Sequence, residues 1–228
     1  MKDQFVVLLS GGLDSSVNLF EAQQNGKILL VLSFNYGQKA AVKEIEAAKN
    51  LCNQLNLKLK TIELPWFQDF GRSSLIVKEK DFPKNREVDI LDPAKSLDSA
   101  RSVWVPNRNG IFLNIAAGFA EALGANAVVP GFNVEEAETF PDNSQDFMNA
   151  LDKSFHFSTA NQVKVKCFTS QMNKSEILSR AVELKVPLNK IWPCYDAKQK
   201  WCGVCESCLR AKRAFLNNKI EIANYFLE

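Results

Sequence analysis

An apolar run that ends in two glycines near the start of the chain narrows the possible folds more than any other segment. Residues 5–9 (FVVLL) fit a buried parallel strand, and residues 10–16 (SGGLDSS) follow directly. The glycines let backbone N–H groups approach a ligand closely, and the helix predicted to follow carries a partial positive charge at its start. The loop therefore predicts a phosphate-binding turn, and the alternative is a plain glycine turn with an Asp or Ser helix cap.

Apolar runs and helix-like segments alternate along the rest of the chain. We expect further strands at residues 27–34, 57–64, 127–131 and 163–168, and helices at residues 40–55, 109–123, 144–158 and from 173 or 175 to 184. This alternation is typical of an α/β fold, here a Rossmann-like, doubly wound parallel sheet with helices on both faces. Residues 65–102 contain few apolar positions, so we expect a long excursion with little regular structure there.

Three later loops carry polar and aromatic side chains beside predicted strands and helices. They contain Asn35-Tyr36-Gly37-Gln38, Val105-Pro106-Asn107-Arg108-Asn109, and residues 131–143. Because open α/β sheets bind ligands at the carboxyl edge of their strands, we expect these loops to meet the glycine loop at one site.

Four cysteines near the end of the chain have the spacing of a metal site. The pattern C-x7-C-x2-C-x2-C is formed by Cys194, Cys202, Cys205 and Cys208. Each x2 spacing lets two thiolates reach one metal from a tight turn, and four sulfurs leave no open position for water. We therefore expect a structural zinc that ties a helical tail to the domain, although an iron–sulfur cluster fits the spacing too. The remaining Cys52 and Cys167 are expected in the core.

The glycine loop has neither the Gly-Lys-Ser/Thr of a Walker motif nor the third glycine of a dinucleotide fingerprint. Its Ser-Gly-Gly-x-Asp-Ser pattern resembles the PP-loop of the N-type ATP pyrophosphatases. Taken in order with the Tyr36 and Arg108 loops, the Phe140-Pro141-Asp142 turn and the terminal cysteines, the pattern resembles the 7-cyano-7-deazaguanine synthase family over residues 5 to about 214. One departure is Asn107, where that family usually has glycine, but Asn tolerates a positive φ better than most residues.

The resemblance implies a fold of the adenine-nucleotide alpha-hydrolase type and a carbon–nitrogen ligase activity. In that family, 7-carboxy-7-deazaguanine, ammonia and ATP give 7-cyano-7-deazaguanine, a precursor of queuosine and related deazapurines. The implied intermediates are an adenylated acid, the amide and an adenylated amide, and the implied cofactors are ATP, magnesium and zinc.

The resemblance also implies an ATP site along the glycine loop. The residues of this site are Leu9, Ser10, Gly11, Gly12, Leu13, Asp14, Ser15 and Ser16. Ser10, Asp14 and Ser15 are candidate catalytic residues together with Arg108 and Lys174. Asp14 would bind magnesium or cap the helix, and Arg108 would grip a phosphate or carboxylate. Lys174 resembles a lysine that the superfamily places near the phosphates, and its alternative is a solvated residue at a helix start.

The guanine-like edge of such a substrate calls for a carboxylate, because it presents an exocyclic amine and a ring N–H. Asp142 is our first candidate for this contact, and Phe140 is a candidate to stack on the ring. The alternative is a solvated acidic loop that caps the helix beginning near residue 143. The predicted substrate-binding residues are Tyr36, Gln38, Glu135, Phe140 and Asp142.

Charge and hydropathy indicate no nucleic-acid or membrane partner. The net charge is +2, and no apolar stretch approaches the ~20 residues of a membrane helix. The first predicted strand begins at residue 5, so we expect no signal peptide before it. We expect a cytoplasmic homodimer with a PP-loop domain at residues 1–190 and a zinc-binding segment at 191–228 packed on it. A tRNA-modifying PP-loop enzyme, or a paralogue that joins the deazaguanine to a protein, remain alternatives.

Overall fold

A sheet of five parallel strands forms the centre of the computed structural model, which describes residues 2–90 and 92–227. The strand order is β3-β2-β1-β4-β5. The strands are β1 (Asp3–Leu8), β2 (Gly26–Asn35), β3 (Leu59–Glu63), β4 (Ala127–Val129) and β5 (Lys164–Val165). All four neighbouring pairs are parallel. The predicted doubly wound sheet is confirmed, although β5 is shorter than the strand predicted at 163–168.

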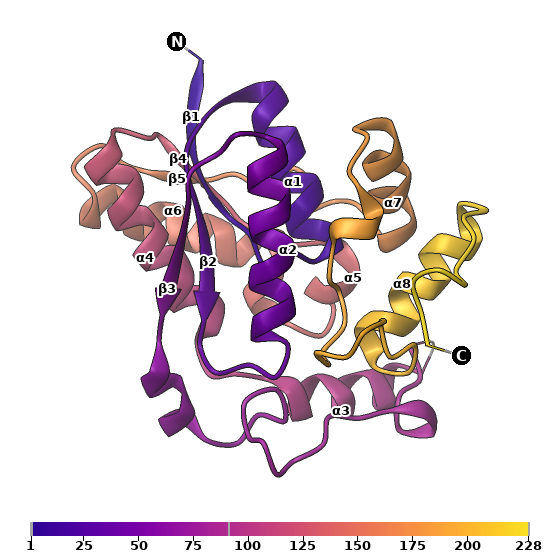
Figure 1. Ribbon diagram of the computed structural model, residues 1–228. Helices are drawn as coiled ribbons and strands as arrows, with labels where there is room; N and C mark the ends of the chain where they lie inside the picture. The colour runs from indigo at the N-terminus through magenta and orange to yellow at the C-terminus, as the bar shows by residue number, and fades with distance from the viewer. Residues whose placement is uncertain (1, 91, 228) are drawn as a thin grey trace.

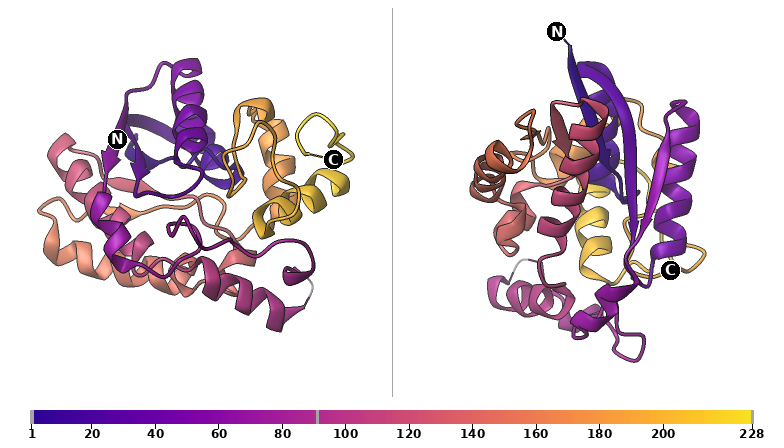
Figure 2. Two further views of the ribbon diagram at one scale, coloured as in Figure 1. Left: turned by 60° about the horizontal axis from the view of Figure 1, so that its bottom comes forward. Right: turned by 90° about the vertical axis from the view of Figure 1, so that its left-hand side faces the viewer.

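Helices cover both faces of this sheet (Figure 2). On one face lie α1 (Leu13–Asn25) and α2 (Ala41–Gln54), with α7 (Lys174–Glu183) beside α1; α4 (Arg108–Leu123) and α6 (Gln145–Ser158) lie on the other. The central strands are apolar on both sides because both sides are covered, and Val6, Val128 and Val129 are fully buried. This burial explains why the strands are unbroken apolar runs in the sequence.

The sheet order reverses between β1 and β4, which are hydrogen-bonded neighbours but far apart in the sequence. Loops that leave the two strands at this point diverge and open a crevice at the carboxyl edge of the sheet. Gly131 allows the loop after β4 to approach the start of α1, because a Cβ at Gly131 would lie 2.6 Å from Ser15 Cα. The glycine loop and residues 131–143 therefore face each other across the crevice.

The excursion after β3 extends below the carboxyl ends of β2 and β3 in Figure 1. It contains two 3-10 turns, η1 (Pro65–Phe70) and η2 (Asn85–Glu87), and then the helix α3 (Pro93–Val103). The prediction of little regular structure was wrong for α3. Its buried face includes Ser96 and Ser99, whose hydroxyls contact Arg210 and Glu206 of α8 (Glu206–Asn217). Because serines occupy two of the buried positions, this helix lacks the regular apolar spacing by which a helix is recognised in a sequence.

The C-terminal segment packs against the rest of the chain and contributes to the same apolar core. The backbone N–H of Trp192 donates to the carbonyl oxygen of Gly11 at 2.6 Å, which joins this segment directly to the glycine loop. Beyond the cysteines, Trp201, Phe215 and Phe226 form an aromatic cluster. Within the parts of the chain that the structure describes, no helix combines the length and apolar character needed to cross a membrane.

Candidate functional site

A cavity of about 250 Å³ lies at the carboxyl edge of the sheet, where the strand order reverses. The glycine loop, the loop after β2, the start of α4, residues 130–143 and the C-terminal segment all contribute to its walls. The predicted site residues on its surface are Leu9, Ser10, Gly12, Leu13, Asp14, Ser15, Tyr36, Gln38, Arg108, Phe140, Asp142 and Lys174. The structure thus brings together all but three of the predicted ATP-site, catalytic and substrate residues; Gly11, Ser16 and Glu135 do not line the cavity.

The start of α1 opens into this cavity without a side-chain cap. Gly12 is the N-cap residue and offers no side-chain cap, and the Gly12 N–H itself donates to Ser10 Oγ over 3.4 Å. The Ser10 and Ser15 hydroxyls lie 3.0 Å apart across the loop. Gly11 has a φ of +80°, and a Cβ there would lie 2.7 Å from Ala47 of α2. Uncapped N–H groups beside two hydroxyls form a suitable cradle for an anionic phosphate.

Asp14 does not cap the helix, because its carboxylate belongs to a buried charge cluster. The Lys174 ammonium contacts Asp14 Oδ2 and also lies 2.8 Å from Glu136 Oε1. Asn133 donates its Nδ2–H to Asp14 Oδ2 at 3.1 Å. Lys174 is only 8% exposed, so it is not the solvated residue of the alternative interpretation. We define Asp14, Asn133, Glu136 and Lys174 as the lysine cluster.

The lysine cluster contains one cation and two carboxylates. Burial would raise the pKa of Glu136, but the charge and hydrogen bond of Lys174, with help from Arg210 and Asn133, outweigh it and lower the pKa to about 2. Burial raises the pKa of Asp14 against the opposing charge of Lys174. The two carboxylates in turn hold the pKa of Lys174 above its ordinary value, although burial acts to lower it. The ammonium is therefore charged at neutral pH, and Glu136 is the carboxyl that its charge keeps ionised.

One atom of this cluster points to a metal ion. Asp14 Oδ1 is buried and has no hydrogen-bond partner among the described residues. A buried carboxylate oxygen without a partner is costly, and hard cations such as magnesium prefer carboxylate oxygens as ligands. Asp14 Oδ1 beside Glu136 therefore fits magnesium, and the magnesium role expected for Asp14 stays a prediction.

On the opposite wall, Arg108 sits at the start of α4 between two predicted substrate residues. It donates to the Tyr36 hydroxyl at 3.4 Å, and its charge opposes the burial that raises the pKa of Asp142. The preceding Asn107 has a φ of +50°, so the positive-φ turn predicted at this position is present. The alternative role of Asp142 as a helix cap is excluded, because the Ser144 hydroxyl caps α6 by accepting from Phe147 N–H.

Gln38 and Glu44 form a hydrogen-bonded pair, of which only Gln38 was predicted as a site residue. The Gln38 side chain accepts from Tyr36 N–H at 3.0 Å and donates to Phe34 O at 3.0 Å and to Glu44 Oε2 at 2.8 Å. Its amide is fully used within the protein, so Gln38 positions neighbours although it lines the cavity. Glu44, which also lines the cavity, was missed because an acid in the first turn of a helix is ordinary.

Aromatic rings line the side of the cavity near Asp142. Phe140 lies parallel to Trp104, with an interplanar angle of 6° and 6.2 Å between ring centroids. Trp104 was not predicted, and its position directly before the Val105-Pro106 segment is the only signal the sequence offers. Glu135 was predicted as a substrate residue, but it lies outside the cavity and binds Arg210 at 2.9 Å and Arg213. Glu136, its neighbour, faces the cavity instead.

The four clustered cysteines form a compact buried site. Their Sγ atoms all lie within 4.8 Å of one another, and Cys202 Sγ is 3.8 Å from Cys208 Sγ. A tetrahedron of sulfurs around zinc has edges of about 3.8 Å, so the donor set fits zinc. Backbone N–H groups of residues 196 and 202 donate to Cys194 Sγ at 3.3 Å, as expected around thiolate ligands. Of the other cysteines, Cys52 is buried as predicted and Cys167 is half-buried against the core.

Known proteins resemble this chain over nearly its full length. Residues 4–219 match the family model described as "Queuosine biosynthesis protein QueC". A relative from Bdellovibrio bacteriovorus named 7-cyano-7-deazaguanine synthase is 54% identical over 98% of this chain and 97% of its own. One of the same name from Carboxydothermus hydrogenoformans is 46% identical over 93% of this chain and 98% of its own. A solved NMN synthetase from Francisella tularensis covers 96% of this chain and 78% of its own with a TM-score of 0.50 at 15% identity, a likeness of fold alone.

Proposed function

Because the chain belongs to the queuosine biosynthesis protein QueC family, we propose that it is an ATP-dependent enzyme that converts 7-carboxy-7-deazaguanine and ammonia into 7-cyano-7-deazaguanine. The single observation that carries this proposal is the lysine cluster beside the uncapped start of α1 in one cavity. Together they offer N–H donors for phosphates, an ammonium group and a candidate magnesium ligand. An acid substrate and ATP need these groups to form an acyl adenylate.

The residues of the cavity divide between the two substrates. The backbone N–H groups at Gly12 and Leu13 and the hydroxyls of Ser10 and Ser15 would hold the phosphates of ATP. Lys174 would balance negative charge as pyrophosphate departs, and Asp14 would hold magnesium. Magnesium, when bound, supplies further positive charge at the leaving pyrophosphate. Most of the catalysis then comes from positioning and charge stabilisation.

The opposite wall would bind the deazaguanine. Asp142 offers a carboxylate to the exocyclic amine and ring N–H, and Phe140 and Trp104 offer parallel aromatic faces. Arg108, held by Tyr36 and Asn109, would grip the carboxylate of the substrate. Gln38 supports this wall through its neighbours, and both of its amide N–H donors are already used within the protein. Because Glu135 lies outside the cavity, we do not propose it as a substrate-binding residue.

The reaction is tested directly by its products. Purified protein is incubated with 7-carboxy-7-deazaguanine, ATP, magnesium and ammonium, and mass spectrometry follows the amide and the nitrile. Chromatography of the nucleotides distinguishes AMP and pyrophosphate, which adenylation requires, from ADP. Formation of ADP, or consumption of ATP without the amide, would contradict the proposal.

Asp142→Ala should weaken binding of the deazaguanine by tens of fold. Two donors left without an acceptor cost roughly 1–3 kcal/mol each when buried. The affinity for ATP should stay within about threefold, because its phosphates would lie at the glycine loop. The thermal midpoint should change little, since Ser144 rather than Asp142 caps α6. Calorimetric titration of each ligand measures both affinities, and the exposed Glu138 of the same loop supplies the control variant Glu138→Ala. Equal loss of both ligands would point to a disordered loop instead of a base contact.

We further propose that the acceptor is free ammonia and that the partners are small molecules. A net charge of +2 supports the absence of a nucleic-acid partner, because such surfaces are strongly basic. The proposed zinc and magnesium follow from the donor sets described above. We still predict that the protein is cytoplasmic and that it forms a homodimer.

A further inference from the structure

Glu44 is an acidic side chain of the cavity that the proposed mechanism has not used. It lies in the first turn of α2, which packs on the glycine loop: a Cβ at Gly11 would lie 2.8 Å from Glu44 O. The carboxyl lines the cavity together with Arg108 and Asp142 of the opposite wall. Within the described residues no lysine or arginine nitrogen forms an ion pair with it, so Glu44 is not neutralised by a partner.

The hydrogen bonding of Glu44 leaves one oxygen available to a ligand. Gln38 donates to Oε2 at 2.8 Å, while Oε1 has no hydrogen-bond partner among residues 2–90 and 92–227. The orientation of the Gln38 amide is fixed, because its oxygen accepts from Tyr36 N–H and its nitrogen also donates to Phe34 O. Gln38 therefore presents only a donor to Glu44 and holds the carboxyl in place.

The surroundings of Glu44 suit a group that exchanges a proton near neutrality. Burial raises the pKa of Glu44 to about 7, although the Gln38 hydrogen bond and the charge of Arg108 on α4 both act to lower it. The Tyr36 hydroxyl is the other titratable group that faces it, and burial raises the pKa of Tyr36, so this hydroxyl is neutral at pH 7. A proton acceptor works best when its pKa lies near the working pH.

We propose that Glu44 accepts the proton released when ammonia attacks the adenylated acid. The nitrogen forms a bond to the acyl carbon, and the C=O electron pair moves to oxygen. Glu44 Oε1 then takes one proton from the cationic nitrogen, and the bond from the carbon to the AMP oxygen breaks as the carbonyl re-forms. The products are the amide, AMP and a protonated Glu44, which returns its proton to solvent. The inference rests on the proposed function and names the group that serves its nitrogen nucleophile.

Glu44→Gln tests this role because it keeps the shape of the side chain and can still accept from Gln38 through its amide oxygen. We expect acid-dependent exchange of pyrophosphate into ATP to stay within about threefold, because adenylation precedes the nitrogen attack. Ammonia-dependent amide formation should fall by about 10²–10⁴-fold, the usual range for a lost proton acceptor. Hydroxylamine should restore product formation to within about tenfold, because its adduct loses a proton to water more readily.

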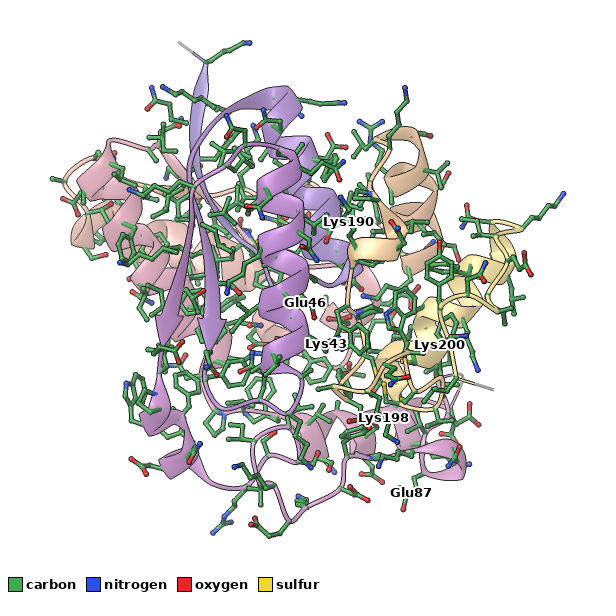
Figure 3. All side chains as sticks on the ribbon, viewed as in Figure 1. Lys43, Glu46, Glu87, Lys190, Lys198 and Lys200 are labelled. Atoms are coloured by element: carbon green, nitrogen blue, oxygen red, sulfur yellow. The ribbon has the colours of Figure 1, made fainter. Side chains whose placement is uncertain are left out.

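Glu46→Gln is the matched control from the same helix. Glu46 is exposed and pairs with Lys43 at 3.1 Å on the side of α2 that faces the C-terminal segment (Figure 3), and its loss should leave both steps unchanged. The pH profile gives a second readout that needs no variant: at a fixed concentration of free ammonia, amide formation should rise through pH about 7 in the unaltered protein and then level off, whereas pyrophosphate exchange should not.

The outcomes separate this inference from the function on which it rests. Normal amide formation in Glu44→Gln, or exchange and amide formation that fall by the same factor, would overturn the role of Glu44 alone. An unaltered protein without acid-dependent exchange would overturn the proposed function and the inference with it. Exchange retained with amide formation lost, and restored by hydroxylamine, establishes Glu44 as the proton acceptor.

Discussion

Cys208→Ser should release the metal and loosen the chain from Trp192 onward. A structural zinc site stabilises a small segment by on the order of 10 kcal/mol, so loss of one thiolate ligand should have the largest effect on stability of any single change considered. The four cysteines are buried. Elemental analysis should fall from about one zinc per chain to well below one, and limited proteolysis should cut first after residue 191.

The same change should also weaken ATP binding, although no cysteine lines the cavity. The link is local, because Trp192 N–H holds the carbonyl of Gly11 in the glycine loop and Pro193 and Tyr195 form part of the cavity wall. Cys167→Ser, a half-buried thiol outside the cluster, is the control and should keep its zinc. Iron with acid-labile sulfide in the unaltered protein would contradict the assignment of zinc, and a tail that stays protease-resistant without metal would contradict its structural role.

Sequence patterns predicted the sheet because its strands are covered on both faces. A strand buried on both sides is mostly apolar, so β1, β2 and β4 each contain an unbroken apolar run. The glycine loop and the cysteine spacing were also predictable, since each depends on residues close together in the sequence. The short β5 shows the limit of this approach: apolar alternation at 163–168 predicted more strand than the pairing with β4 supports.

Features that depend on side-chain direction could not be predicted in the same way. Glu135 and Glu136 are neighbours, but adjacent residues of a helix point about 100° apart. Glu136 therefore reaches Lys174 and the cavity, whereas Glu135 reaches Arg210 and Arg213 on α8. Nothing in the local sequence decides which of the two faces inward. Only the packing of α8, whose Arg210 and Arg213 lie 75 and 78 residues after Glu135, settles it.

Helix α3 was missed for a related reason. The polar contacts of Ser96 and Ser99 with α8 replace the apolar stripe that usually identifies a helix. The cap at Asp92, which accepts from the N–H groups of Ala94 and Lys95, was present as a local signal. Without an apolar stripe after it, that signal is too common in loops to indicate a helix.

Lys174→Met should both inactivate the enzyme and destabilise the fold. The variant leaves the buried Asp14 carboxyl and the half-buried Glu136 carboxylate without their shared cation. Removing one partner from a buried ion pair costs about 3–5 kcal/mol, because the remaining charge stays desolvated. Turnover should fall by at least an order of magnitude, since the ammonium beside the phosphates is lost. Chemical denaturation gives the free energy of unfolding, and Lys166→Met, which removes an exposed pair with Asp3, should cost less than about 1 kcal/mol.

The pH dependence of this loss has a definite sign. With Lys174 present, the pKa of Glu136 is about 2 in the folded state against an ordinary 4.5, so its contribution to stability is complete above pH about 4.5 and fades as the pH falls toward 2. Without Lys174, burial and mutual repulsion raise the pKa of both carboxyls above their unfolded values. Stability from such groups is present at low pH and lost as the pH rises through the folded pKa. The difference in unfolding free energy between the two proteins should therefore grow from pH 5 to pH 7.5. Glu44, whose pKa is also raised, does not affect this difference, because both proteins contain it.

The double variant Asp14→Asn/Lys174→Met separates stability from catalysis. Removing a second charge leaves Glu136 as the only ionisable group of the lysine cluster, and its side chain is 30% exposed and so can be solvated. We expect the double variant to recover more than half of the lost stability and to show a weaker dependence on pH between 5 and 7.5. It should stay inactive, because the candidate magnesium ligand and the ammonium are both gone. Recovery of activity together with stability would show that Lys174 and Asp14 only maintain the fold, and would remove them from the ATP site.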